Sequence, residues 1–189
     1  FSVCIVGAGI AGGAMACALQ KLEYSVALVE ANPIATQLPA VEASVAGFDS
    51  RVSAITPASA ALIADLGCWE AVLAERTCAY GAMEVWDGEG TGRIHFDASE
   101  VRAPQLGHIV ENRILSHALT RQVNDCGRVQ IYNPAKLESL IRDAGRSALR
   151  LDNGDEIQCD LLIGADGALS QIRRLAEFKT REWDYGHHA

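Results

Sequence analysis

The sequence predicts an α/β fold built around a parallel sheet. Residues 2–6 (SVCIV) are a short apolar run rich in β-branched residues, which is typical of a strand buried on both faces. A glycine-rich turn and small or apolar residues at helical spacing follow over residues 7–22, and residues 25–30 form a second apolar run. A strand, a helix and a strand in this order predict a right-handed β-α-β unit with parallel strands.

The next segment is a long connection followed by a helix. Residues 31–52 lack periodicity and contain two prolines, so we expect a loop, of a length that is usually functional or mobile in compact domains. Thr56 is expected to cap a helix that begins at Pro57 and runs to Leu66, with Gly67 as its C-terminal stop. We expect this helix to be structural.

Later segments alternate between strand and helix patterns. Polar and apolar residues alternate over residues 83–97 around a turn at 87–90, which predicts a half-exposed antiparallel hairpin. Helical spacing returns over residues 113–123, and Asn-Gly at 153–154 predicts a tight hairpin turn. The run at 161–163 predicts a third buried strand, followed by a short helix.

The composition limits the possible partners. The chain has 189 residues, of which 49% are hydrophobic and 21% charged, and its net charge of −8 excludes a general nucleic-acid binder. No apolar run approaches the roughly 20 residues of a transmembrane helix, so we expect a cytoplasmic protein without a transmembrane segment. The cysteines form no C-x-x-C pair, and we expect them to be reduced and buried. They are Cys4, Cys17, Cys68, Cys78, Cys126 and Cys159.

A metal site is not expected. His187 and His188 are adjacent, and adjacent residues of a strand point to opposite faces. The sequence also has no Cys/His cluster of ligand spacing that could join them.

The turn after the first strand carries a functional pattern. Gly7, Gly9 and Gly12 fit G-x-G-x-x-G between a buried strand and a helix. Gly7 permits the tight turn, Gly9 allows the backbone to approach a diphosphate, and Gly12 allows the helix and the strand to pack closely. A diphosphate would lie against free backbone N–H groups at the positive end of the helix dipole. Glu30 ends the second strand, where a carboxylate can accept hydrogen bonds from ribose hydroxyls.

These features predict a dinucleotide-binding site. The alternative is that the glycines only turn the chain and that Glu30 is a solvated strand end. The agreement of motif, context and acidic residue favours binding. A carboxylate at position 30 opposes a 2′-phosphate in the same pocket, so FAD or NAD is favoured over NADP at this site.

Four later segments narrow the class of dinucleotide protein. They are residues 49–55 (DSRVSAI), 66–69 (LGCW), 107–112 (GHIVEN) and 163–173 (IGADGALSQIR). Together they closely resemble the FAD-dependent aromatic-ring hydroxylases of ubiquinone biosynthesis, and the resemblance extends over the whole chain. Residues 83–87 (MEVWD) and 183–189 (WDYGHHA) are most similar to the 2-polyprenylphenol hydroxylase branch, which acts at C5 of the ring.

The resemblance implies a fold and an activity. The fold would be the p-hydroxybenzoate hydroxylase type, a three-layer Rossmann-like FAD/NAD(P)-binding domain with a β excursion from the substrate domain. FAD would be the cofactor, NAD(P)H its reductant, and O₂ and a polyprenylated phenol or quinol the other substrates. The implied division gives residues 1–79 and 108–180 to the FAD-binding domain, 80–107 to the excursion and 181–189 to the start of the substrate domain. Contacts with other ubiquinone-biosynthesis proteins and with the periphery of the inner membrane stay open.

The resemblance also assigns residues, although it identifies no catalytic residue. Asp166 and Gly167 form an Asp-Gly motif that the family links to the FAD diphosphate region and to NAD(P)H use. Arg51 matches an arginine close to the flavin in relatives, and Asn112 falls where many relatives carry an arginine near the cofactor. The alternatives are an ordinary turn for Asp166 and a solvated charge for Arg51. Leu169 replaces a common Asn and puts only a local helix-capping bond in doubt.

Relatives have a second flavin motif, Gly-Asp-Ala-Ala-His, which contacts the ribityl chain and is absent here, so we expect an N-terminal part that is not a competent hydroxylase alone. Trp69 and Trp86 are expected to be packing residues. Two other hypotheses stay open. One is a flavin- or NAD-dependent dehydrogenase without oxygen chemistry, and the other is a non-catalytic dinucleotide-binding subunit of a biosynthetic assembly.

Overall fold

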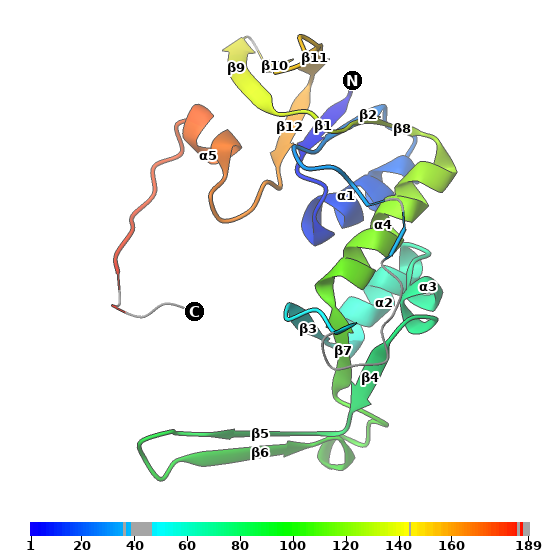
Figure 1. Ribbon diagram of the computed structural model, residues 1–189, viewed down its shortest axis with the longest axis vertical. Helices are drawn as coiled ribbons and strands as arrows, with labels where there is room; N and C mark the ends of the chain where they lie inside the picture. Colours follow the sequence, from blue (N-terminus) through cyan, green and yellow to red (C-terminus); the bar gives the residue numbers. More distant parts are fainter. Residues whose placement is uncertain (36, 39–46, 144, 185, 187–189) are drawn as a thin grey trace.

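The structure is a computed structural model that describes residues 1–35, 37–38, 47–143, 145–184 and 186. Figure 1 shows a sheet and helices in its upper part, a small second sheet below them, and a long hairpin at the opposite end. His187 and His188 lie outside the described residues, so the prediction made for them stays a prediction.

A four-stranded parallel sheet in the order β12-β1-β2-β8 forms the centre of the upper part. Its strands are β1 (Val3–Val6), β2 (Val26–Val29), β8 (Val129–Tyr132) and β12 (Leu161–Gly164). Helix α1 (Ile10–Gln20) connects β1 to β2, which confirms the predicted β-α-β unit. Strand β8 was not predicted.

The third predicted strand is not fully buried. Strand β12 is an edge strand of this sheet, and Leu161 at its start is 54% exposed. Its apolar run is typical of a central strand, but only β1 pairs with it among the described strands. A short apolar run cannot distinguish an edge strand from a central one, because that depends on which strands pair with it.

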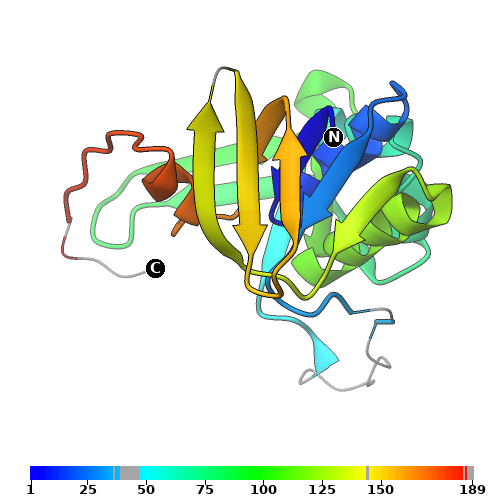
Figure 2. The same cartoon turned by 90° about the horizontal axis from the view of Figure 1, so that it is seen from above.

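The two faces of the parallel sheet carry different layers. On one face, Val3, Ile5, Val26 and Leu28 pack in one core with helices α1 and α4 (Asn112–Cys126). On the other face, Cys4, Val6, Ala27 and Val29 pack against an antiparallel sheet. Its strands are β9 (Leu137–Asp143), β10 (Arg146–Leu151) and β11 (Glu156–Cys159), followed later by the short helix α5 (Gln171–Leu175). Figure 2 shows the antiparallel strands, yellow to orange, on one side of the blue strands and green α4 on the other. The three-layer α/β prediction is confirmed.

A second, three-stranded antiparallel sheet lies below α4 in the order β3-β7-β4. Its strands are β3 (Val52–Ile55), β4 (Thr77–Tyr80) and β7 (Gly107–Glu111). Helices α2 (Pro57–Asp65) and α3 (Trp69–Leu73) lie between β3 and β4 in the chain. The predicted start of α2 is confirmed, because Thr56 Oγ1 accepts a hydrogen bond from the Ser59 N–H at 3.3 Å. Trp69 packs as predicted, edge-to-face on His108 with 5.2 Å between ring centroids.

The predicted hairpin is confirmed, but its exposure is greater than expected. Strands β5 (Ala82–Trp86) and β6 (Arg93–Asp97) form a two-stranded sheet, followed by a 3₁₀ turn, η2 (Ala98–Val101). The hairpin projects away from the rest of the structure and is exposed on both faces. Trp86 is 67% exposed, so the prediction that it packs is wrong. Alternation predicted the strands but not what covers them.

The cysteines follow the prediction only in part. All six thiols are free, and Cys4, Cys17, Cys68 and Cys159 are buried, whereas Cys78 and Cys126 are exposed. Within the described ranges, no helix is long and apolar enough to cross a membrane. The same residues include no group of three His, Cys, Asp or Glu side chains that could hold a metal ion.

Candidate functional site

The three glycines of the first turn have different environments. Gly7 has a φ of +104°, and a Cβ there would lie 2.3 Å from the Ala165 carbonyl oxygen. A Cβ on Gly12 would lie 1.8 Å from the Gly7 carbonyl oxygen. At Gly9, by contrast, no described atom lies within 4 Å of the Cβ position. Gly7 and Gly12 are therefore required by backbone packing, while Gly9 leaves the space in front of α1 open.

The start of α1 is suited to an anion. Gly9 is the N-cap residue and has no side chain that could accept a hydrogen bond from the first turn. The first N–H groups of a helix have no partner within the helix and carry the positive end of its dipole. A phosphate group placed beside Gly9 would satisfy these donors.

Glu30 is fixed beside the glycine turn. Its Oε2 accepts a hydrogen bond from the Ala8 N–H and its Oε1 accepts one from the Asn32 N–H, both at 2.8 Å. A carboxylate oxygen can accept two hydrogen bonds, so each oxygen retains capacity for another donor. The side chain can therefore hold two hydroxyls of a ribose.

Six of the eight predicted residues line one cavity of about 650 Å³ at the carboxyl ends of β1, β2 and β12. They are Gly7, Gly9, Glu30, Arg51, Asp166 and Gly167. Open α/β sheets bind their ligands outside the carboxyl ends of the strands, so the position of the cavity fits a ligand site. Gly12 lies behind the turn, against Gly7.

A second cavity of about 370 Å³ adjoins the first. It shares Gly9, Glu30 and Asn32 with the larger cavity and extends along α4 to Arg113 and Thr120. The shared walls make the two cavities parts of one site, long enough to extend from the strand ends to α4.

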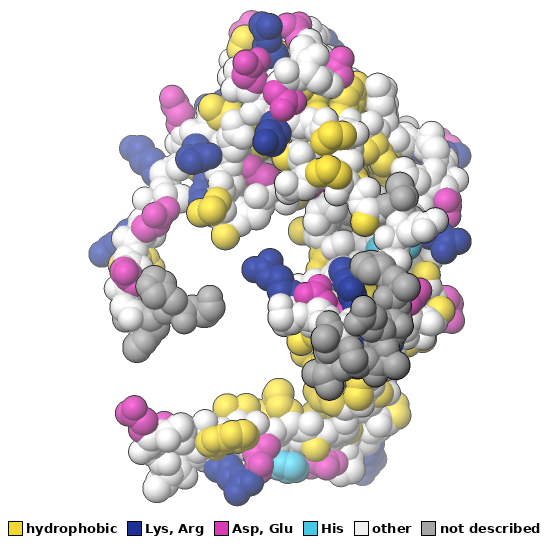
Figure 3. Space-filling view, in the orientation of Figure 1, with side chains coloured by type: hydrophobic (Ala, Val, Ile, Leu, Met, Phe, Trp, Pro, Cys, Tyr) yellow, Lys and Arg dark blue, Asp and Glu magenta, His cyan; other side chains and the backbone are white. Residues whose placement is uncertain are grey.

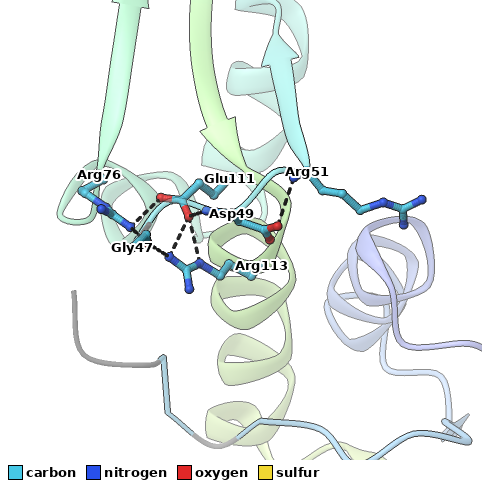
Figure 4. Close-up of polar contacts among 6 residues, drawn as sticks. All are labelled: Gly47, Asp49, Arg51, Arg76, Glu111 and Arg113. Atoms are coloured by element: carbon cyan, nitrogen blue, oxygen red, sulfur yellow. Dashed lines mark hydrogen bonds and ion pairs between the residues drawn. The ribbon is translucent and has the colours of Figure 1, made fainter. Parts of the chain in front are cut away.

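Arg51 supplies positive charge to the larger cavity. Figure 4 shows its side chain extending away from Glu111 and from the arginines beside it. In the described part of the chain, no hydrogen bond or ion pair to its guanidinium is found, although its backbone N–H donates to Asp49 Oδ1 at 3.0 Å. An arginine in this position can bind phosphate oxygens through several N–H donors.

Asp166 has a local structural task. Its Oδ1 accepts a hydrogen bond from Ser170 Oγ at 2.5 Å, and its Oδ2 accepts from the N–H groups of Gln171 at 2.6 Å and Ile172 at 3.1 Å. Burial opposes ionisation, but the Ser170 hydroxyl and the N–H donors outweigh it and hold the pKa of Asp166 below its usual value. The carboxylate therefore holds the turn, and cofactor contacts from this motif would come from its backbone.

The positive φ of +84° at Gly167 shapes the same turn. Ser170 caps α5, because its Oγ accepts a hydrogen bond from the Arg173 N–H at 2.9 Å. Leu169, which stands where relatives commonly carry Asn, is 88% exposed and does not disturb this cap.

Asn112 lies outside the walls of both cavities. Its Oδ1 accepts a hydrogen bond from Ser53 Oγ at 2.6 Å, and its N–H donates to the Arg51 carbonyl oxygen at 3.0 Å. The structure thus joins Asn112 to the backbone of Arg51, and a direct contact with the cofactor stays a prediction.

Sequence reasoning missed a charged cluster behind Arg51, formed by Glu111, Arg76 and Arg113 (Figure 4). Glu111 is only 3% exposed and pairs with Arg76 at 3.0 Å and with Arg113 at 2.7 Å. Burial raises the pKa of Glu111, but the Asp49 N–H and the two guanidinium groups reverse this effect, and the net pKa lies below its ordinary value. The sequence signal that could have indicated this cluster is a glutamate at the end of an apolar strand, two residues before an arginine.

The fold and the cavity are those of a dinucleotide-binding α/β domain in which the start of α1 is suited to an anion. The sequence profile of the FAD-binding domain family matches residues 1–186, and the chain belongs to this family. The residues present fit FAD: Gly9 leaves room for a diphosphate, Glu30 can hold ribose hydroxyls, and Arg51 adds a cation.

Several curated relatives have names from ubiquinone metabolism. The 3-demethoxyubiquinol 3-hydroxylase of Escherichia coli (strain K12) is 38% identical over 187 residues, which cover 97% of this chain and 45% of that protein. The mitochondrial ubiquinone biosynthesis monooxygenase COQ6 of Xenopus tropicalis is 35% identical over 211 residues, covering 100% of this chain and 42% of the relative. The chain thus spans less than half the length of these relatives.

Solved structures share the fold. The probable FAD-dependent monooxygenase PqsL from Pseudomonas aeruginosa superposes with a TM-score of 0.74 at 20% identity, over 97% of this chain and 47% of that one. For the p-nitrophenol 4-monooxygenase PnpA from Pseudomonas putida DLL-E4, the TM-score is 0.71 at 19% identity, over 93% and 43% of the chains. At these identities the likeness concerns the fold alone.

Proposed function

We propose that this chain forms the FAD-binding part of an NAD(P)H-dependent monooxygenase that hydroxylates a polyprenylated phenol or quinol ring in ubiquinone biosynthesis. The observation that carries the proposal is the cavity around which Gly9, Glu30 and Arg51 gather, in a chain whose relatives are ubiquinone-biosynthesis hydroxylases. Because the chain spans less than half of those relatives, the activity is proposed for the whole protein.

Each residue of the cavity has a task in this proposal. Glu30 holds the adenosine ribose, because its oxygens keep acceptor capacity beside their bonds to Ala8 and Asn32. The N–H groups after Gly9 receive the diphosphate, and Arg51 adds a positive charge nearer the flavin. When bound, FAD would supply the redox chemistry: NAD(P)H would provide two electrons, one oxygen atom of O₂ would enter the ring, and the other would leave as water.

The apolar face of the hairpin supports the proposal that the substrate is apolar. The cross-strand pairs Met83 with Phe96 and Val85 with Ile94 place four apolar side chains on one face, and each of them is 42–56% exposed. Figure 3 shows hydrophobic side chains on the side of the hairpin that looks into the hollow of the structure. An exposed apolar face that looks into this hollow suits a polyprenyl chain better than a small polar ring. That residues 80–107 belong to the substrate domain, and that the ring is hydroxylated at C5, are parts of this proposal.

The test uses the complete protein with FAD, NAD(P)H and a polyprenylated phenol under ¹⁸O₂. The expected result is one labelled oxygen atom in the product for each NAD(P)H consumed, with NMR of the product assigning the ring position. Oxidation of the substrate without labelled oxygen would instead support a dehydrogenase. Absence of flavin reduction by NAD(P)H, with and without the phenol, would support a non-catalytic subunit.

A further inference from the structure

We propose that Glu111 is the positioning residue for Arg51: the buried Glu111 carboxylate fixes the backbone of residues 47–51 so that the Arg51 guanidinium faces the cofactor cavity. The inference rests on the proposed function, in which Arg51 provides the cation beside bound FAD. It assigns a task to a buried charged residue that touches neither cavity.

Glu111 ends β7, and its carboxylate is the centre of the cluster in Figure 4. Its Oε2 accepts hydrogen bonds from Arg113 Nε at 2.9 Å and from the Asp49 N–H at 2.8 Å, and its Oε1 pairs with Arg76 Nη2 at 3.0 Å. A carboxylate that is 3% exposed is costly unless it is paired and hydrogen-bonded. Asp49 therefore belongs to the set of donors that allow Glu111 to remain ionised.

The same two arginines hold the chain two residues earlier. The Gly47 carbonyl oxygen accepts hydrogen bonds from Arg76 Nη2 at 2.6 Å and from Arg113 Nη2 at 2.9 Å. The Arg76 guanidinium also lies 4.0 Å from the ring centroid of Phe48, within cation–π range. The two arginines thus bind the Gly47 carbonyl oxygen, and Glu111 binds the Asp49 N–H, so the backbone of this segment is held at two points.

From Asp49 the fixation extends to Arg51. The Arg51 N–H donates to Asp49 Oδ1 at 3.0 Å, and the Arg51 carbonyl oxygen accepts from the N–H of Asn112, the residue after Glu111, at 3.0 Å. Both sides of the Arg51 backbone are held, while its side chain lines the cavity. Since ordering a loop costs conformational entropy, fixing this backbone before the ligand arrives increases affinity for the ligand.

A merely structural role for the cluster makes a different prediction. If Glu111 only stabilised the fold, its replacement would lower stability and weaken FAD binding independently of Arg51. If it acts through Arg51, its effect on FAD binding must vanish once the guanidinium is gone. A double-mutant cycle measures this difference.

The experiment compares wild type, Glu111→Gln, Arg51→Gln and the double variant of the complete protein. FAD is titrated into each apoprotein, and thermal unfolding of the apoprotein checks that it is folded. We expect each single variant to weaken FAD binding roughly ten-fold, and the double variant to bind no more weakly than Arg51→Gln alone. Glu138→Gln is the matched control, because it removes the exposed pair (3.3 Å) between Glu138 on β9 and Arg150 on β10 and should leave FAD affinity unchanged.

The outcomes separate the two proposals. Unchanged affinity in Glu111→Gln, or additive losses in the double variant, overturns the positioning role while Arg51 keeps its task. Unchanged affinity in Arg51→Gln overturns the task of Arg51, and with it the basis of the inference. If Glu111→Gln does not fold, Glu111→Asp, which keeps the charge but shortens the reach, takes its place in the same cycle and is judged by the same criteria.

Discussion

The Ala8 N–H donates a hydrogen bond of 2.8 Å to Oε2 of Glu30, which ties the glycine-rich turn after β1 to the end of β2. The bond fixes the carboxylate relative to the start of α1. The proposed ribose acceptor and the proposed diphosphate site therefore lie at a set separation before any cofactor binds, and such preorganisation reduces the entropy that binding costs.

Replacing Glu30 by arginine should weaken FAD binding by about 2 kcal/mol, or roughly 30-fold, because a hydrogen-bond acceptor is lost and a cation takes its place. Glu30→Gln keeps the size and one acceptor oxygen, so its effect should be smaller. Titration of FAD into the apoproteins of the complete enzyme measures both. Equal affinity in the arginine variant and wild type would sink the assignment of Glu30.

Substitutions at Gly9 and Gly12 should differ in whether they weaken FAD binding or lower the stability of the fold. Gly9→Ala places a methyl group in open space, so it should cost about 1 kcal/mol of stability or less while obstructing FAD. Gly12→Ala places one 1.8 Å from the Gly7 carbonyl oxygen, which should cost about 3 kcal/mol or more. Denaturant unfolding of the apoproteins and FAD titration provide the two measurements. Similar losses of stability in both variants would contradict the different environments of these positions.

Asp166 should make stability depend on pH in the acid range. Its pKa in the folded protein is below the ordinary value of 3.8, because the Ser170 hydroxyl and two helix N–H groups outweigh the effect of burial. The unfolded chain therefore binds the proton more tightly, so this stabilisation is complete above the ordinary pKa and is lost as the pH falls through the folded value. Asp166→Asn should reduce the slope of the unfolding free energy with pH below about pH 5. If the unfolding free energies of the variant and of wild type fall in parallel as the pH is lowered, Asp166 does not contribute to the pH dependence.

The apolar face of the hairpin should matter for the tail of the substrate. Ile94→Glu places a carboxylate in the path proposed for a polyprenyl chain, so KM for a polyprenylated phenol should rise roughly ten-fold. KM for the tail-less phenol should stay near that of wild type. Glu84→Gln, on the opposite face of the hairpin, is the control and should leave both constants unchanged. A rise in KM for both substrates in Ile94→Glu would place the tail elsewhere.

The sequence by itself determined the features that short segments control. The glycines at 7, 9 and 12, the acidic residue at 30, the Thr56 cap and the turn at Gly154 all follow from local backbone requirements. A positive φ, a free helix N-terminus or a tight turn restricts the residue type within a few positions, so the pattern can be recognised without the fold. The β-α-β unit followed from residues 2–30, and the family resemblance from the later motifs at 49–55, 66–69, 107–112 and 163–173.

Only the tertiary structure decided how residues that are distant in the chain share contacts. It placed Arg76 beside Glu111, joined Asn112 to Arg51, left Trp86 exposed and made β12 an edge strand. A charged side chain can be buried only where an oppositely charged partner lies beside it, because an unpaired buried charge is costly. An apolar side chain is buried only where another element packs over it. Such pairings have no fixed spacing in the sequence, and they arise only when the strands and helices pack together.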